Sequence, residues 1–234
     1  MELGYNKNMG RLIEDPDLRD KRFVFEDRRD AGRRLAAILE PYRGTNVFLL
    51  AVPSGGVPVA AEAARILSLP LDLLIVRKLQ IPFNPEAGFG AMSLSGNILL
   101  NDELVESLGL GKEAIAAAVN VTKKVLDQRN RLFRGGRPLP SCQDKKVIIT
   151  DDGLASGSTM RVAARWIRGM KPERIIVAVP TGSERTAEIM RGEADEIVCL
   201  NIRGGYRFAV AEAYRHWHDV SDDEVLQIIG AIPR

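Results

Sequence analysis

The stretch VIITDDGLASGST, residues 147–159, decides which fold the chain can adopt. It begins with an apolar run, Val147 to Ile149, that has the length of a buried strand. Two adjacent carboxylates, Asp151 and Asp152, follow this strand, and a loop of small and hydroxylated residues then leads into a helical pattern. A buried strand, a loop and a helix in succession form the repeating unit of parallel sheets that carry helices on their faces.

The chemistry of this stretch suits a phosphorylated sugar. Ligands of open α/β sheets bind at the carboxyl ends of the strands, where this loop is expected. Gly, Ser and Thr residues at the start of a helix offer backbone N–H groups and hydroxyls to a phosphate, whose charge the helix dipole favours. Carboxylates repel a phosphate, so Asp151 and Asp152 are expected beside it, on sugar hydroxyls or near a magnesium ion. The alternative is an ordinary strand–loop–helix corner that binds nothing.

Alternating strand and helix patterns continue along most of the chain. Apolar runs of strand length lie at 47–52, 71–76, 174–179 and 196–200. Helical patterns lie at 31–39, 57–67, 111–133, 184–191 and 221–229. The order predicts an α/β fold, in which an open, parallel, twisted sheet is flanked by helices. Residues 1–22 are polar and are expected to form an irregular N-terminal arm, and residues 23–229 are expected to form one domain.

Composition narrows the classes of function. The chain has 234 residues, 45% of them hydrophobic, and its 33 basic and 31 acidic residues leave a net charge of +2. This balance gives no reason to expect a nucleic acid or a membrane as partner. The sequence contains no secretory apolar region at its start and no apolar run long enough to span a bilayer, so we expect a cytoplasmic protein. Cys142 and Cys199 lack metal-ligand spacing, which indicates reduced thiols, and His216 and His218 lack a third ligand nearby in the sequence.

Three further segments are expected at the same edge of the sheet. The segment PSGG, residues 53–56, ends the first strand, and its two glycines permit close approach by an anion. Arg77 and Lys78 follow the second predicted strand and would bring positive charge to this edge. Residues 79–95 contain prolines and glycines without a sustained period, which predicts a long loop that is either functional or disordered. Residues 89–93 and 98–101 are candidates for a hairpin around Ser95-Gly96-Asn97.

The stretch 147–159 resembles the phosphoribosyl pyrophosphate motif of the type I phosphoribosyltransferases, in which a hydrophobic strand is followed by two acids and a small, hydroxylated loop. Further similarity lies in Phe25-x-Asp27-Arg28-x-x-Ala31-Gly32, in Arg77-Lys78 and in Asn84-Pro85-Glu86. The whole pattern covers residues 23–229 and looks like a poorly characterised bacterial branch of that family. The resemblance implies the type I fold, with a mobile loop or hairpin within 80–90 and a small hood from the N-terminal segment and residues 201–220.

The resemblance also implies a reaction in nucleotide metabolism and a role for each motif. The reaction is transfer of the 5-phosphoribosyl group from phosphoribosyl pyrophosphate to a nitrogenous acceptor, such as a nucleobase, with release of pyrophosphate. The donor's phosphate would bind the loop Ala155, Ser156, Gly157, Ser158 and Thr159. Its ribose hydroxyls would bind Asp151 and Asp152, which would lie in the outer shell of a Mg²⁺ cofactor and not ligate it directly. Its pyrophosphate would bind Ser54, Gly55, Gly56, Arg77 and Lys78. The expected catalytic residues are Asp151, Asp152, Arg77 and Lys78, and the expected mobile-loop residues are Asn84 and Glu86.

Two positions depart from the family's pattern. Ser54 stands where relatives often carry Arg or Lys, so one positive charge expected at the pyrophosphate is missing. Ala155 stands where enzymes acting on 6-oxopurines often carry an Asp that handles a proton of the base, which argues against hypoxanthine or guanine as acceptor. The acceptor is expected near the aromatic residues of 203–208 and 214–218.

The sequence leaves other functions open. One is a non-catalytic regulator or sensor that binds phosphoribosyl pyrophosphate or a nucleotide, and another is hydrolysis or phosphate transfer on a different phosphorylated sugar. A homodimer is an expectation from the family alone.

Overall fold

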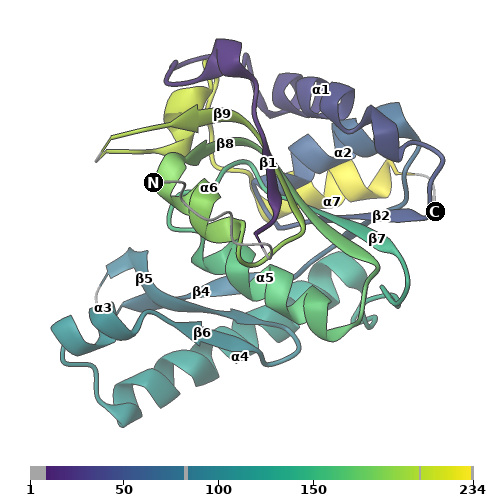
Figure 1. The fold of residues 1–234 in the computed structure, drawn as a ribbon. Helices are drawn as coiled ribbons and strands as arrows, with labels where there is room; N and C mark the ends of the chain where they lie inside the picture. Colours follow the sequence, from purple (N-terminus) through teal and green to yellow (C-terminus); the bar gives the residue numbers. More distant parts are fainter. Residues whose placement is uncertain (1–8, 82–83, 206, 233–234) are drawn as a thin grey trace.

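The centre of the fold is a parallel sheet whose strands carry the expected apolar runs. A computed structural model describes residues 9–81, 84–205 and 207–232. Six strands pair in the order β1-β9-β8-β7-β2-β3, and every pairing between them is parallel (Figure 1). Their bounds are β1 Arg11–Ile13, β2 Val47–Ala51, β3 Leu71–Leu73, β7 Lys146–Thr150, β8 Arg174–Ser183 and β9 Glu196–Arg203. The predicted open parallel α/β sheet is therefore confirmed.

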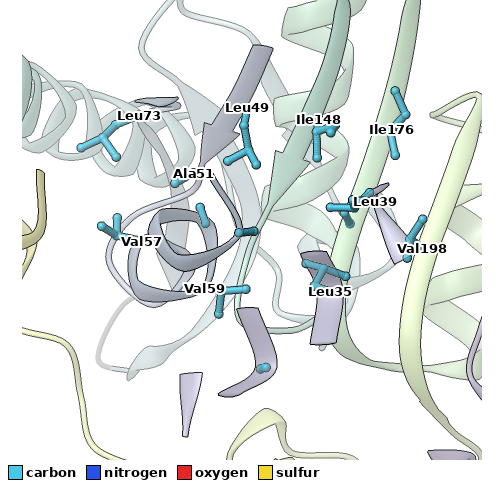
Figure 2. Packing of buried hydrophobic residues seen from close by; sticks show 14 of the residues in the cluster. Leu35, Leu39, Leu49, Ala51, Val57, Val59, Leu73, Ile148, Ile176 and Val198 are labelled. Carbon is cyan, nitrogen blue, oxygen red and sulfur yellow. The ribbon is translucent and has the colours of Figure 1, made fainter. Parts of the chain in front are cut away.

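Both faces of this sheet are covered by helices, which explains why its strands are continuously apolar. The helices are α1 Arg28–Ile38, α2 Gly56–Leu67, α5 Ser158–Gly169, α6 Glu184–Met190 and α7 Asp222–Gly230. Alternate strand residues point to opposite faces, so Leu49 and Ile148 join the cluster with α1 and α2, while Leu50 and Ile149 join the cluster with α5 and α6. Figure 2 shows part of the first cluster, and Figure 1 shows α1, α2 and α7 on one side of the sheet. Burying each large side chain of this kind contributes about 1.5–3 kcal/mol.

A second, smaller sheet lies beside the main one (Figure 1). It is antiparallel and consists of β4 Val76–Ile81, β5 Asn84–Ser93 and β6 Ile98–Leu100, followed by α3 Asp102–Ser107 and α4 Lys112–Arg134. One of its faces packs on α4 through Leu79 and Phe89, and the other packs toward α5 through Val76 and Ala91. The small sheet thus stands between the long helix and the phosphate-loop helix.

This sheet corrects two predictions. Residues 71–76 do not form one strand, because the chain leaves the main sheet after Leu73 and starts a new strand at Val76. Residues 79–95 are not a long loop, because most of them belong to β4 and β5. The glycines in this segment interrupt the alternating pattern typical of a strand, but they allow close packing of the neighbouring strands. A Cβ on Gly90 would lie 2.5 Å from the Leu99 carbonyl oxygen. The predicted hairpin around Ser95-Gly96-Asn97 is confirmed as the β5–β6 turn.

Further differences concern strands β1, β9 and β8 of the main sheet. Part of the segment expected as an irregular arm, Arg11–Ile13, forms β1 and pairs with β9. Strands β8 and β9 run to Ser183 and Arg203, beyond the predicted ends. Short 3₁₀ turns lie at Pro16–Leu18, Glu40–Tyr42 and Val210–Ala213. Within the described ranges, no helix combines the length and the apolar character needed to cross a membrane.

Candidate functional site

The two predicted carboxylates lie at the carboxyl end of β7, against the glycine loop that follows β2. The Asp152 amide donates to Asp151 Oδ1 at 2.8 Å, and the Val52 amide, at the end of β2, donates to the Thr150 carbonyl at 2.8 Å. A Cβ on Gly55 would lie 2.0 Å from Asp152 Oδ2. Only a residue without a side chain fits there, so the acidic pair and the segment 53–56 form one continuous surface. The sequence-based placement of these two motifs together is correct.

A buried arginine that the sequence analysis did not assign to the site holds one of these carboxylates. Arg28, at the first turn of α1, donates from Nε to Asp152 Oδ2 at 3.0 Å, and its Nη2 forms an ion pair with the same oxygen at 2.9 Å. Its Nη1 donates to the His218 carbonyl at 2.8 Å, and its guanidinium lies 3.9 Å from the centre of the Trp217 ring. The Arg28 side chain is only 6% exposed, so these contacts fix its position. Its place in the sequence pattern 25–32 was the one available signal.

Aromatic residues from the C-terminal part of the chain complete this corner. The Tyr214 hydroxyl donates to the Asp152 carbonyl at 2.6 Å, and the ring of Tyr214 packs 5.4 Å from Trp217 and 5.7 Å from Phe25. The expected hood segment 214–218 therefore lies beside the acidic pair. In the other expected segment, Arg203 is buried and pairs with Glu212 at 2.6 Å, while Tyr206 lies outside the described residues.

Burial sets the protonation chemistry of the acidic pair. Desolvation raises the pKa of Asp151 well above its ordinary value, and the neighbouring Asp152 charge raises it further. The pKa of Asp152 is also raised by burial, but the Arg28 guanidinium opposes that rise. The positive charge of Lys78 likewise opposes the rise in the pKa of Asp151. The pair is therefore a site where added positive charge or hydroxyl donors would be favourable.

The phosphate-type loop is pinned to β8 and leaves the start of α5 open. The Leu154 amide donates to the Thr181 carbonyl at 2.8 Å, and the Thr186 hydroxyl donates to the Ala155 carbonyl at 2.6 Å. Gly157 is the N-cap residue of α5, adopts a left-handed φ of 72° and makes no side-chain hydrogen bond to the first turn of the helix. Among the described residues, the first turn of α5 is thus uncapped, an arrangement that suits an anion.

A cleft of about 1070 Å³ borders this loop. Its lining includes Ala155, Ser156 and Ser158 on one side and Gly88 and Gly90 of the small sheet on the other. The Ser156 and Ser158 hydroxyls lie 3.1 Å apart, at the mouth of the uncapped helix. The loop predicted to bind phosphate is therefore accessible from outside.

The predicted basic pair occupies a different position from the one expected. Arg77 and Lys78 do not follow a strand of the main sheet but lie within β4 of the small one. Neighbouring strand residues point to opposite faces, and accordingly Arg77 is half-buried toward α4 while Lys78 is exposed and its charge acts on Asp151. Lys78 therefore still lies near the acidic pair, and Arg77 lies near Arg129 of α4.

Other candidates are placed less closely. Asn84 and Glu86 belong to β5, and their side chains lie outside the described residues. His216 and His218 contact Glu26 and Glu224, each at 2.9 Å. Both cysteines are free and buried.

Known proteins are similar to this chain in sequence and in fold. A family model described as "Phosphoribosyl transferase domain" matches residues 26–215. Two curated Mycobacterium tuberculosis proteins are each 40% identical over 211 residues: "Putative phosphoribosyl transferase MT0597" of strain CDC 1551 / Oshkosh and "Putative phosphoribosyl transferase Rv0571c" of strain ATCC 25618 / H37Rv. The alignment covers 90% of this chain and 47% of each relative, so the chain spans about half the length of these relatives.

A solved structure, TT1426 from Thermus thermophilus, is 32% identical, with a TM-score of 0.71 over 88% of this chain and 98% of that one. The family match includes the buried arginine of α1, the glycine loop, the acidic pair and the phosphate-type loop. The chain therefore belongs to the phosphoribosyl transferase domain family.

Proposed function

We propose that the chain transfers the 5-phosphoribosyl group of phosphoribosyl pyrophosphate to a nitrogenous acceptor and releases pyrophosphate. One observation carries the proposal: a carboxylate pair, a glycine loop and an uncapped helix start meet at one edge of the sheet. These are the groups needed to bind, in order, sugar hydroxyls, a pyrophosphate and a terminal phosphate.

Each group would contribute to breaking the bond between C1 and the pyrophosphate oxygen. The loop 155–159 would hold the 5-phosphate, and Asp151 and Asp152 would accept hydrogen bonds from the ribose hydroxyls. Positive charge develops on the sugar as the bond breaks, in an oxocarbenium-like transition state, and the nearby carboxylates favour it. Arg77 and Lys78 would stabilise the charge that grows on the departing pyrophosphate.

A magnesium ion fits this site only with help from the substrate. Across the described residues, no three His, Cys, Asp or Glu side chains group as ligands. Mg²⁺ usually keeps several waters and binds substrate phosphates, so the buried Asp151 and Asp152 would serve as its outer shell. When bound, the ion would neutralise charge on the pyrophosphate.

The acceptor would be a nucleobase or a similar nitrogen compound. Trp217 packs on the buried Tyr214 beside the acidic pair and, at 38% exposed, offers aromatic surface near the sugar site. Ala155 exposes a methyl group where a proton-handling carboxylate would suit a 6-oxopurine, so we propose an acceptor outside that group.

The test is binding followed by turnover. Calorimetry should detect phosphoribosyl pyrophosphate with Mg²⁺ in the wild type, and the double variant Asp151→Asn/Asp152→Asn should lose most of that affinity. Asp127→Asn, on the exposed side of α4, serves as the control and should bind normally. A screen of nucleobases should then show pyrophosphate release with one of them. Absence of binding refutes the proposal, and binding without any turnover identifies a sensor instead of a transferase.

A further inference from the structure

Helix α4 brings one arginine to the glycine loop. Arg129 Nη2 donates to the Ser54 hydroxyl at 3.0 Å and to Asp222 Oδ1, in the first turn of α7, also at 3.0 Å. The Arg129 side chain is 19% exposed, so it is largely enclosed by its neighbours yet reachable at the loop. Ser54 and Arg129 are 75 residues apart in the chain, and sequence spacing gives no hint of this contact.

A second guanidinium, that of Arg77, lies close enough to Arg129 for their charges to interact. Arg77 is on the face of β4 that packs on α4, and burial, followed by the charge of Arg129, lowers its pKa. Asp222 opposes this effect, but its side chain is 48% exposed and is shared with Arg129. Two cations share one partly solvated carboxylate, and one of them, Arg129, contacts Ser54, so the loop lies beside net positive charge. That surplus favours an anion there.

The position of this charge matches the residue that the loop lacks. The family resemblance implies a positive charge at the position of Ser54, directly before the two glycines. Here the serine hydroxyl accepts a hydrogen bond from a guanidinium that arrives from another element. A guanidinium can bind two phosphate oxygens at once, so its origin in the chain matters less than its location.

We propose that Arg129 is a pyrophosphate-binding residue that replaces, from helix α4, the cation missing at Ser54, with Asp222 as its counter-ion when the anion is absent. This inference rests on the proposed function, because the anion is the pyrophosphate group of the donor. The competing explanation is a purely structural one, in which Arg129 ties α4 to α7 and to the loop.

Ligand selectivity separates the two explanations. The probes are Mg²⁺-pyrophosphate, phosphoribosyl pyrophosphate with Mg²⁺, and ribose 5-phosphate, each titrated by calorimetry. Losing one charge-assisted contact should weaken binding of the first two to Arg129→Gln by roughly 10- to 100-fold. Ribose 5-phosphate, which lacks the pyrophosphate, should bind within about twofold of wild type. Arg131→Gln, an exposed arginine on the same helix, is the matched control and should bind all three normally.

Two further variants move the charge. Ser54→Arg in the Arg129→Gln background should restore most of the pyrophosphate affinity, because it returns a cation to the loop. Asp222→Asn should tighten pyrophosphate binding, since Arg129 would no longer be shared. Arg129→Lys keeps the charge without the fork and should give intermediate affinity, and it replaces Arg129→Gln in the comparison if that variant does not fold.

The outcomes distinguish this inference from the proposed function. If the wild type binds phosphoribosyl pyrophosphate and Arg129→Gln binds it equally well, the inference is wrong and the proposed function stands. Equal losses for pyrophosphate and ribose 5-phosphate would show a structural role and also overturn the inference. If the wild type binds neither pyrophosphate ligand, both proposals fail.

Discussion

Replacing Arg28 by Met should strongly destabilise the protein, because it leaves a buried carboxylate without its partner. The guanidinium makes one hydrogen bond and a close ion pair to Asp152 Oδ2, and the two side chains are 6% and 14% exposed. Removing one member of such a buried pair costs about 3–5 kcal/mol. The stacking of Arg28 on Trp217 contributes about 0.5–2 kcal/mol of attraction, part of which the Met side chain retains. We therefore expect a loss of about 3–5 kcal/mol in the free energy of unfolding.

Urea denaturation measures this loss, with Arg29→Met as the control. Arg29 is the next residue along α1 but is exposed, so its replacement should change stability by less than about 0.5 kcal/mol. A double-mutant cycle with Asp152→Asn should show coupling of about 1–3 kcal/mol, because the neutral amide no longer needs the arginine.

The stability loss of Arg28→Met should depend on pH, whereas a loss caused by packing alone would not. Burial already raises the pKa of Asp152, and Arg28 opposes that rise. Without the arginine the folded-state pKa rises further above the unfolded one, so the ionised carboxylate destabilises the fold at high pH. Stability of Arg28→Met should therefore recover toward wild type as the pH falls from about 8 to about 5. A loss equal to that of Arg29→Met, or one that does not depend on pH, would refute this reasoning.

Three other substitutions test the geometry of the site. Gly55→Ala places a methyl group against the Asp152 carboxylate, which cannot rotate away, so turnover should fall by about 100-fold. The control Gly169→Ala has open space around the added methyl group and should leave the kinetics unchanged. Equal kinetics for the two variants would be contrary evidence. Burial raises the pKa of the Asp151 carboxyl, so the ionised group destabilises the fold at neutral pH, and Asp151→Asn should raise Tm there while abolishing transfer. This gain in Tm should disappear as the pH falls toward the pKa of the carboxyl in the unfolded state. A lower Tm in calorimetric scans would contradict this. Thr186→Val deletes the hydrogen bond to the Ala155 carbonyl and should lower the free energy of unfolding, measured in urea, by about 0.5–1.5 kcal/mol. It should also weaken the binding of ribose 5-phosphate. Unchanged affinity would show that the loop keeps its conformation without this hydrogen bond.

Local patterns in the sequence predicted the centre of the fold and of the candidate site. The run Val147 to Ile149 is apolar because helices cover both faces of its strand. A run of this kind can be recognised from the local sequence alone. The acidic pair and the segment 53–56 could be placed together because parallel strands end at the same edge of a sheet. The roles of these residues in transfer remain predictions.

The residues that sequence reasoning missed depend on contacts between distant parts of the chain. Arg28 and Arg129 are two among many arginines, and only the packing of α1 and α4 brings them to the strand ends. Strand β4 was hidden because Arg77 and Lys78 interrupt its apolar residues, and both of its faces are used by other elements. Strand β1 has three residues, too few to show a period.

The pairing of β1 with β9 also orders events during synthesis. Arg11 pairs with Glu196, so β1, the earliest described strand, lacks its partner strand until residues beyond 196 have left the ribosome. The small sheet and α4 have neighbours close in sequence and can form long before. Until β9 arrives, the edge of β8 stays open to pairing with other chains. The nascent chain should therefore be most prone to aggregation before β9 has been synthesised, and chaperones should bind nascent chains that stop before residue 196 more than those that extend beyond residue 203.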